Sequence, residues 1–344
     1  MKMVDVAQVV NLSEAGADAE KWPAVPRLEN GWYPTGGEVD PAVNSGLMNW
    51  QARQLALRSE TLRARVDDLA LKAGSTVTVG NSGDFSTVNE ALSYLSERRP
   101  GYVQGGFQTQ ILLLDGFTMA EQILVSGVNL GWISIVAEAA EVFIDRAYMN
   151  VPFHEGAAPI YPSFGVKDGG TLPRIDALFT MMDTGPTAGR MGINAFSGGF
   201  ATVGGMCGIK NCGDTAVLLT TSASFAGNGS VFSGAGGDGA SVAGGTQSTF
   251  QGADLSGAGD TGLRVSNGAV SHAWGLDASG AGQKGVHVYR GATLNLLGGK
   301  CRKGGSDSTQ DIVCESGSII NATNATGGTS IAVNTVTPNG IIFK

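Results

Sequence analysis

Hydrophobic positions recur every 23 residues in the second half of the chain. Glycines mark this period, and the residues at a fixed distance from each glycine share one character. The marker glycines are Gly213, Gly236, Gly259, Gly282 and Gly305. A constant period of about 20 to 50 residues is typical of architectures built from stacked repeats. We therefore expect a solenoid whose coils are clearest over residues 204–316.

Columns of apolar residues stand at fixed offsets from the marker glycines. The inward columns are Ile209, Phe232, Leu255, Ala278 and Cys301, then Val217, Ala240, Leu263 and Val286, and then Leu219, Val242, Val265 and Val288. Because strand side chains alternate between two faces, the second and third columns predict a short strand with one face in the core. A column of Ala216, Gly239, Gly262 and Gly285 predicts a corner that admits almost no side chain. Three strands and three turns fit such a coil, with neighbouring coils about 4.8 Å apart.

Residues 107–145 predict one strand after another. Ile, Leu and Val dominate four short runs, which turns containing glycine separate. The runs are Thr109–Leu114, Gln122–Val125, Trp132–Val136 and Val142–Ile144. Near-continuous apolar runs are typical of parallel strands that neighbouring elements cover. Residues 146–200 are less regular, with an excursion expected near 147–163, and the chain after Ser316 predicts short closing coils or strands.

Helix-forming residues dominate from Leu47 to Ala73. Apolar side chains recur there at every seventh position, and a second column follows four positions later, as in the seam of a coiled coil. The first column is Met48, Leu55, Leu62 and Leu69. Because Ser and Ala occupy part of the seam, we expect residues 47–74 to form a weak oligomerisation helix. The alternative is a single helix that packs on its own domain.

The first 46 residues mix proline, glycine and aromatic side chains without a sustained period. Trp22, Trp32 and Tyr33 supply a large contact area at a low cost in side-chain entropy. A segment that cannot build its own core is suited to lie along a partner. Residues 1–46 are therefore a candidate docking arm, and a loosely ordered tail is the alternative.

Composition narrows the choice of partner and of chemistry. Glycine accounts for 53 of 344 residues, as many tight turns between short strands require, and 42% of the residues are hydrophobic. The net charge of -8 and the scattered basic residues disfavour a nucleic-acid partner. The four cysteines, Cys207, Cys212, Cys301 and Cys314, lack the spacing of a metal site, so we expect neither metal nor cofactor.

The sequence offers no recognisable targeting or membrane segment. Its N-terminus lacks the basic region and apolar run of a signal peptide, and 18 apolar residues never run together. We therefore expect no membrane insertion. An extracellular role would require release by lysis or by assembly rather than secretion through a signal peptide.

Two carboxylates in the periodic region are the candidates for catalysis. Asp254 and Asp277 stand five residues before successive marker glycines, on the outward side and one coil apart. A separation of about 5 Å suits the two carboxylates of a retaining glycosidase. Solvated surface, or a contact with a sugar or a cation, are the alternatives. The candidate ligand-binding side chains in these coils are Trp274, His287, Tyr289 and Arg290.

The segment from Val77 to Leu95 predicts a short strand, a glycine turn and an amphipathic helix. It contains Gly83-Asp84-Phe85-Ser-Thr-Val and then Glu90-Ala-Leu. This stretch resembles the N-terminal cap of right-handed parallel β-helix proteins, including pectinesterase-like enzymes and many phage tailspikes. A stack of coils needs such a lid because its first coil exposes the core. We expect a cap at 75–106 and a β-helix at 107–344. The catalytic Gln-Asp, Asp and Arg set of pectinesterases finds no match.

The order of arm, heptad helix, cap and glycine-rich β-helix resembles that of bacteriophage tail-fibre and tailspike proteins. The resemblance implies an all-β, right-handed parallel β-helix in a homotrimer that is made in the host cytoplasm and carried on the virion. It implies attachment to other virion proteins through residues 1–46 and binding of a host surface glycan through the solenoid. A polysaccharide-depolymerising tailspike is the alternative, and a bacterial surface adhesin is a weaker one.

Overall fold

The computed structural model describes residues 47–71, 75–100, 109–153, 159–182, 187–302, 311–326, 334–336 and 340–343. The docking candidates Trp22, Trp32 and Tyr33 lie outside these residues. The chain divides into two units, residues 1–72 with 97–101 and residues 73–96 with 102–344. None of the described helices is long and apolar enough to cross a membrane.

The first unit contains one long helix. The helix α1 spans Leu47–Leu69, and β1 (Ala70–Leu71) then pairs in parallel with β3 (Arg99–Pro100). The predicted helix is confirmed, but it ends four residues before Ala73 because the backbone of residues 70 and 71 is used in β-pairing. Leu55 and Leu62 are 54% and 48% exposed, while the side chains of Met48 and Leu69 are outside the described part of the chain. The association of helices stays a prediction.

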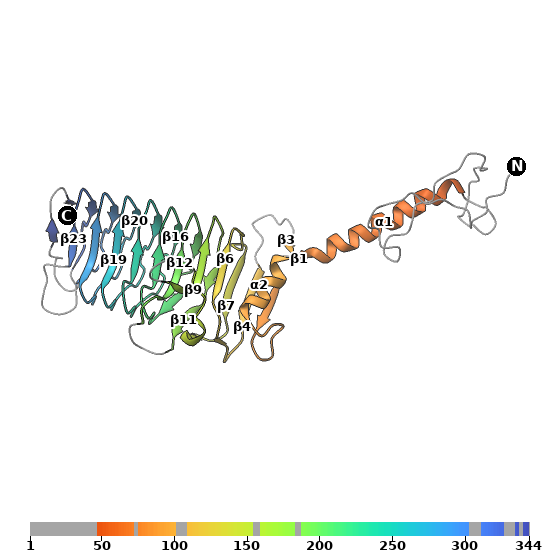
Figure 1. Cartoon of the computed structure of the whole chain (residues 1–344), viewed down its shortest axis with the longest axis horizontal. Coiled ribbons are helices and arrows are strands. Elements are labelled where there is room, and N and C mark those ends of the chain that lie inside the picture. The colour runs from red at the N-terminus through yellow and green to blue at the C-terminus, as the bar shows by residue number, and fades with distance from the viewer. Residues whose placement is uncertain are drawn as a thin grey trace. The chain divides into compact units, whose positions relative to one another are not determined.

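The second unit is a parallel β-helix (Figure 1). Its nine-stranded sheet contains β6 (Ile123–Ser126), β9 (Tyr161–Lys167), β12 (Arg190–Ala195), β15 (Val217–Leu219), β17 (Ala240–Val242), β19 (Thr261–Ser266), β21 (Lys284–Tyr289), β23 (Ile312–Cys314) and β25 (Asn334–Val336). Its seven-stranded sheet contains β13 (Phe200–Thr202), β16 (Ser224–Ala226), β18 (Gln247–Thr249), β20 (Val270–His272), β22 (Thr293–Asn295), β24 (Ile319–Asn321) and β26 (Ile341–Phe343). The predicted parallel β-helix is thus confirmed.

Two shorter sheets and a column of backbone bridges make up the remaining face. One sheet contains β2 (Thr76–Val79), β4 (Thr109–Leu113), β7 (Ile133–Ala137) and β10 (Arg174–Asp176), and the other contains β5 (Thr118–Met119), β8 (Val142–Ile144), β11 (Leu178–Met181) and β14 (Gly208–Lys210). The bridge column continues through Gly208, Val231, Asp254, Asp277, Lys300 and Thr326. A regular coil therefore passes from the bridge column to the nine-stranded sheet and then to the seven-stranded sheet.

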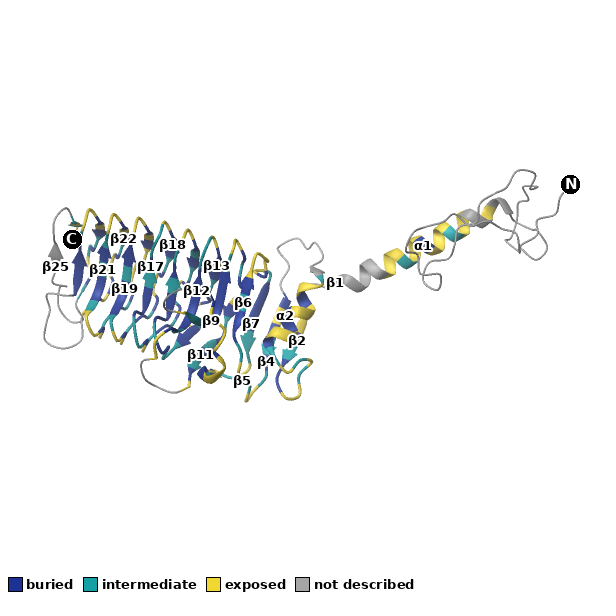
Figure 2. Ribbon diagram, in the orientation of Figure 1, coloured by how far each residue is buried: buried dark blue, intermediate teal, exposed yellow. Residues whose placement is uncertain are grey.

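The 23-residue period sets the register between coils. Val217 is paired with Ala240, Ala240 with Leu263 and Leu263 with Val286. All three predicted inward columns are buried, and Figure 2 shows the buried residues along the strands of the solenoid. The glycine corner is also confirmed, since a Cβ added to Gly262 would lie 2.6 Å from the carbonyl oxygen of Gly285. Stacking of backbone on backbone excludes a side chain there.

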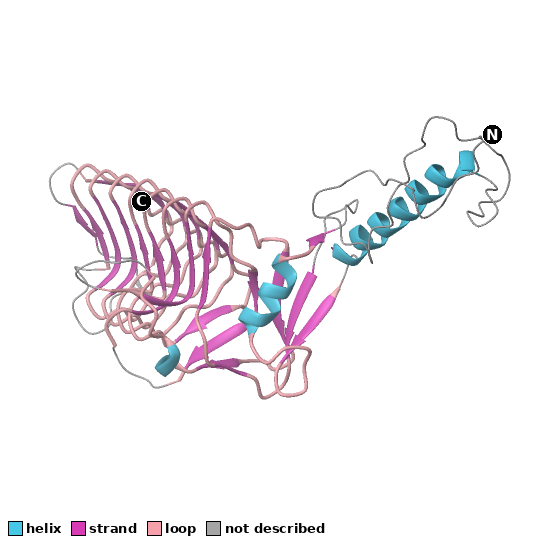
Figure 3. Cartoon of the chain, turned by 45° about the vertical axis from the view of Figure 1, so that its right-hand side comes forward, coloured by secondary structure: helices cyan, strands magenta, loops and turns pink. Residues whose placement is uncertain are grey.

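The predicted strand, turn and amphipathic helix form the cap. The helix α2 (Val88–Ser96) follows β2 and buries Val88, Ala91, Leu92 and Leu95. The carboxylate of Asp84 accepts hydrogen bonds from the N–H and hydroxyl of Thr78 at 2.9 and 2.8 Å, which closes the turn. Figure 3 shows α2 beside the first strands of the solenoid. The helix covers apolar side chains that a further coil would otherwise bury.

The predicted excursion after β8 covers part of the nine-stranded sheet. A 3-10 helix (Arg146–Tyr148) begins it, and Phe153 lies so close to Gly165 of β9 that an added Cβ there would be 2.8 Å from the phenyl ring. Gln122 donates from its amide nitrogen to the carbonyl oxygens of Val151 at 3.1 Å and Pro162 at 2.9 Å. The outer face of this sheet is therefore covered near its first strands.

Candidate functional site

A groove runs over four strands of the seven-stranded sheet. It has a volume of about 310 Å³ and is lined by Phe200, Ser224, Phe225, Gln247, Ser248, Thr249, Val270 and His272. Pairing between coils places Phe200, Ser224, Gln247 and Val270 in one outward column, and Thr249 and His272 in a second. The groove thus lies on the outer face, with side chains from neighbouring coils stacked along it.

The local sequence explains why these side chains point outward. Strands β16, β18 and β20 have three residues each, and the middle residue of each is buried. In β18 and β20 the middle residue is serine, and the hydroxyl of Ser248 donates to that of Ser271 at 3.0 Å. A satisfied pair of hydroxyls can occupy the core at little cost. The flanking residues must then face the solvent.

The side chains of Ser224, Gln247 and His272 are free to bind a ligand, whereas the hydroxyl of Thr249 is buried and that of Ser248 bonds to Ser271. Ser224, Gln247, Thr249 and His272 make no side-chain hydrogen bond to any other described residue. The lining contains no Asp, Glu, Lys or Arg. Phe200 and Val270, each 37% exposed, add apolar surface. Uncharged donors and acceptors beside apolar surface match the chemistry of a sugar ring, which carries hydroxyls at its edge and C–H groups on its faces.

The predicted ligand-binding residue Trp274 follows the same sheet. It lies two residues beyond His272, in the turn after β20, and is 44% exposed. Leu297 occupies the equivalent turn of the next coil and is 38% exposed. The backbone of the turn is fixed because the carbonyl oxygen of Trp274 accepts from the N–H of Gly252 at 2.7 Å. Trp274 thus belongs to the coil that carries Val270 and His272 into the groove.

The structure separates the predicted carboxylate pair from this groove. Asp254 and Asp277 are bridge partners in successive coils of the bridge column, as the repeat predicts. Each carboxylate accepts a backbone hydrogen bond, Asp254 from Ser256 at 2.9 Å and Asp277 from Ser279 at 3.1 Å. Lys300 lies 3.5 Å from Asp277. Both carboxylates therefore stabilise their turns, and a catalytic role stays a prediction.

His287, Tyr289 and Arg290 lie on yet another part of the coil. His287 and Tyr289 face outward from β21 in the nine-stranded sheet, with their rings stacked 4.5 Å apart. Arg290 occupies the corner after β21 with a φ of 56°, a left-handed conformation that is unfavourable for residues other than glycine. The sequence makes these three residues and Trp274 candidates for ligand binding, which stays a prediction. The coil places them on opposite sides of a corner, since β21 and β20 belong to different sheets.

The imidazole of His287 takes part in a closed network. Its Nε2 lies 3.3 Å from a carboxylate oxygen of Glu315, and its Nδ1 lies 3.3 Å from the ammonium nitrogen of Lys284. Burial, followed by the nearby Lys284 charge, lowers the pKa of His287. Neutral imidazole accepts from Lys284 through Nδ1, and Nε2 is buried beside the Glu315 carboxylate.

A partly buried ion-pair cluster extends this network by one coil. The same guanidinium nitrogen of Arg264 lies 2.9 Å from Asp238 and 3.0 Å from Asp260. Burial raises the pKa of Asp238 to about 6, although the Arg264 charge acts in the opposite direction. Arg264 and His287 are paired across neighbouring strands. The repeat could have predicted that Arg264 and His287 face outward side by side, because each stands five residues after a marker glycine, between the two inward columns.

The described cysteines and acidic groups do not form a metal site. No group of three His, Cys, Asp or Glu side chains in the described residues is placed to hold a metal ion. Cys212 and Cys301 are buried, and burial raises the pKa of the Cys301 thiol to about 12. Within the described part of the chain, the groove of the seven-stranded sheet combines unpaired polar side chains with exposed apolar surface.

Comparisons with known proteins give the following results. No protein-family model and no curated protein match the sequence. Among solved structures, the A-module of the mannuronan C-5 epimerase AlgE4 from Azotobacter vinelandii is similar, with 12% sequence identity and a TM-score of 0.31. The similarity covers 81% of this chain and 95% of that chain.

Proposed function

We propose that the β-helix binds a surface polysaccharide without charged groups, along the outer face of the seven-stranded sheet. One observation carries the proposal, namely the groove of about 310 Å³ in which the side chains of Ser224, Gln247 and His272 have no hydrogen-bond partner within the described chain. A ligand hydroxyl can bond to Gln247 or His272 without first breaking an internal hydrogen bond. This lowers the cost of binding, because only hydration is exchanged. Trp274 extends the site with a ring face.

The full chain tests this proposal on an array of immobilised bacterial surface polysaccharides. We expect binding to at least one neutral polysaccharide, with about tenfold weaker binding for Gln247→Ala and for Trp274→Ala, as loss of one hydrogen bond or one ring contact predicts. Ser241→Ala, an outward position on the nine-stranded sheet, is the matched control and should bind as the wild type does. Binding confined to anionic polysaccharides, or equal binding by all variants, would reject the groove as the site.

The biological setting that we propose is host attachment by a bacteriophage or a related particle. In this proposal residues 1–46 dock to other virion proteins, and the helix α1 brings three chains together. Support comes from the exposed Leu55 and Leu62 on that helix and from the modular order of the sequence. Mass measurement in native solution should give three chains for the wild type and one for Leu55→Ala/Leu62→Ala. A single chain for the wild type would overturn the trimer.

The enzymatic alternative keeps Asp254 and Asp277 as its carboxylates. Its support is their position on successive coils, which gives backbones one strand spacing apart. Incubation with a polysaccharide that the chain binds should then release reducing ends or unsaturated products, and Asp254→Asn and Asp277→Asn should abolish the release. Binding without release supports the non-enzymatic function.

A further inference from the structure

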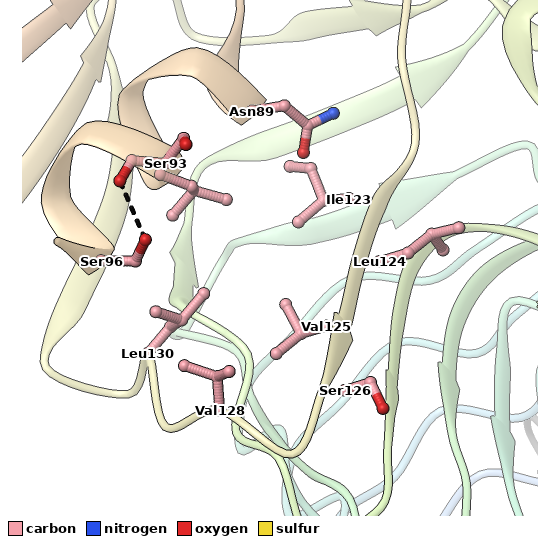
Figure 4. Close-up of a pocket in the computed structure, with 10 residues that line it drawn as sticks. Asn89, Ser93, Ser96, Ile123, Leu124, Val125, Ser126, Val128 and Leu130 are labelled. Carbon is pink, nitrogen blue, oxygen red and sulfur yellow. Dashed lines mark hydrogen bonds between the residues drawn. The ribbon is translucent and has the colours of Figure 1, made fainter.

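A second groove lies in the cap, between α2 and the first strand of the nine-stranded sheet (Figure 4). Its volume is about 310 Å³. It is lined by Asn89, Leu92, Ser93 and Ser96 from α2, by Ile123, Leu124, Val125 and Ser126 from β6, and by Val128 and Leu130 from the turn that follows. Figure 4 shows the two serines of the helix across from the strand. The lining is apolar and small polar, without a charged side chain.

The strand along this groove has an unpaired edge. β6 is the first described strand of its sheet and, among the described strands, pairs with β9 only. Gly127 donates its N–H to Lys167 in the next coil at 3.1 Å. Since alternate residues of a parallel strand direct their backbone groups to opposite sides, Leu124 and Ser126 direct their N–H and C=O groups away from β9. Neither residue has a backbone partner on that side within the described chain.

The residue before β6 confirms which way these groups point. Gln122 precedes Leu124 and Ser126 at the same alternating position along the strand. Its carbonyl accepts a hydrogen bond at 3.0 Å from the side chain of Asn89 in α2. The edge groups of Leu124 and Ser126 therefore face α2 as well. A helix uses its own backbone groups internally, so α2 covers the core but cannot pair with the strand.

The helix is fixed at a distance that keeps this edge accessible. Glu121 accepts hydrogen bonds from the N–H groups of Val88 at 2.6 Å and Asn89 at 3.0 Å, which attaches the first turn of α2 to the solenoid. Farther along the helix, the exposed Ser93 and Ser96 are too short to fill the space over the strand. The hydroxyl of Ser96 bonds instead to the carbonyl of Ser93 at 2.8 Å.

We propose that this groove binds an extended, uncharged peptide segment of a partner protein, which adds as a strand to β6. Only an extended backbone presents donors and acceptors at the spacing of the free N–H and C=O groups of Leu124 and Ser126. Alternate side chains of such a segment would contact the apolar surface of the half-buried Leu124 and the exposed Val128. A charged side chain would lose hydration there without gaining an opposite charge. The site is distinct from the polysaccharide groove and independent of it.

A display library of random heptapeptides, selected on the full chain, tests this inference. We expect enrichment of uncharged peptides with apolar residues at alternate positions. Ser126→Pro should weaken their binding at least about tenfold, because proline removes the edge N–H while being tolerated on edge strands. Ser126→Ala is the matched control, since it keeps the N–H and removes only the hydroxyl that bonds to Asp168. It should bind as the wild type does.

A second variant and a direct measurement distinguish a lost binding site from a variant that fails to fold. Ser93→Trp changes an exposed helix position and should fill the groove, so peptides selected on the wild type should not bind it. Hydrogen exchange should show that a selected peptide slows exchange of the Leu124 and Ser126 amides about tenfold or more. Enrichment that is equal on wild-type and Ser93→Trp protein overturns the proposal. So does a peptide that leaves both amide exchange rates unchanged, or an enriched set that is mainly charged.

Discussion

The nine-stranded and seven-stranded sheets enclose the same core, but their outer faces differ in chemistry. On the nine-stranded sheet, Arg264 is paired with Asp238 and Asp260, and His287 lies between Lys284 and Glu315. On the seven-stranded sheet, the described outward positions carry no Asp, Glu, Lys or Arg, and the outward groove side chains of Ser224, Gln247 and His272 make no hydrogen bond within the described chain. The charged clusters of the nine-stranded sheet are thus used within the protein, whereas these three side chains of the groove are available to a ligand.

The difference shows that the more highly charged cluster is not the better candidate for binding. A ligand at the His287 network would have to compete with existing ion pairs, and each lost partner would leave a charge without compensation. A ligand at Gln247 and His272 replaces only water. Perturbed pKa values mark active sites and structural ion pairs alike. In this protein, hydrogen-bond donors and acceptors without an internal partner distinguish a candidate binding site from a structural ion pair.

The largest effect should come from breaking the ion pair of the nine-stranded sheet. Arg264→Gln leaves the buried carboxylate of Asp238 without its partner, so the free energy of unfolding should fall by about 3 kcal/mol. Thermal and denaturant unfolding measure the loss, and polysaccharide binding should not change. The double variant Arg264→Gln/Asp238→Asn should recover part of the stability, because the uncompensated charge is gone. Weaker polysaccharide binding by the single variant, at full folding, would contradict the division between the two faces.

The pH dependence of stability should differ between the wild type and Asp238→Asn. The pKa of Asp238 is raised from 3.8 to about 6 in the folded chain. The folded state therefore holds this proton more tightly, and the associated stability is present below the unfolded pKa and lost as the pH rises through about 6. Between about pH 4 and 7 this amounts to about 2 kcal/mol. Unfolding curves of both proteins across this range should differ in slope, and parallel pH profiles would show that Asp238 titrates normally.

Substitutions in the groove should change binding and leave stability intact. His272→Ala removes an exposed side chain without an internal partner, so the free energy of unfolding should change by less than about 0.5 kcal/mol. Affinity for a bound neutral polysaccharide should fall about tenfold, which equals about 1.4 kcal/mol. Titration by calorimetry gives the affinity. A matched loss of stability would assign His272 a structural role.

The smallest effect should come from the serine pair beneath the groove. Ser248→Ala leaves the hydroxyl of Ser271 without its partner in the core and should cost about 1 kcal/mol of stability. The double variant Ser248→Ala/Ser271→Ala should be nearly neutral, since no unpaired hydroxyl remains. Denaturant unfolding distinguishes the two. A double variant that is less stable than the single variant would show that the two serines stabilise the strands by more than their hydrogen bond to each other.

Much of the fold follows from the repeat. Val217 and Leu219, and their equivalents in later coils, alternate with outward residues, so the strand and its buried face can be assigned from the spacing of apolar residues alone. The strands of the seven-stranded sheet are less evident. Ser248 and Ser271 occupy inward positions where the pattern shows no apolar residue, because they satisfy each other across coils. The groove above them was therefore not predicted, although Trp274 in the turn after β20 was a ligand-binding candidate.

The sequence by itself determined the period, the stacking of equivalent residues and the faces on which they lie, because burial of a column depends only on offset from a marker glycine. Asp254 and Asp277 share one offset from their marker glycines, so the sequence alone predicted that they lie side by side on successive coils. Only the tertiary structure decided which outward polar groups are paired. That outcome depends on side-chain directions and on separations of about 3 Å between coils, where a hydrogen bond or ion pair either forms or does not. Whether the free edge of β6 is accessible likewise depends on the position of α2, which no local pattern specifies.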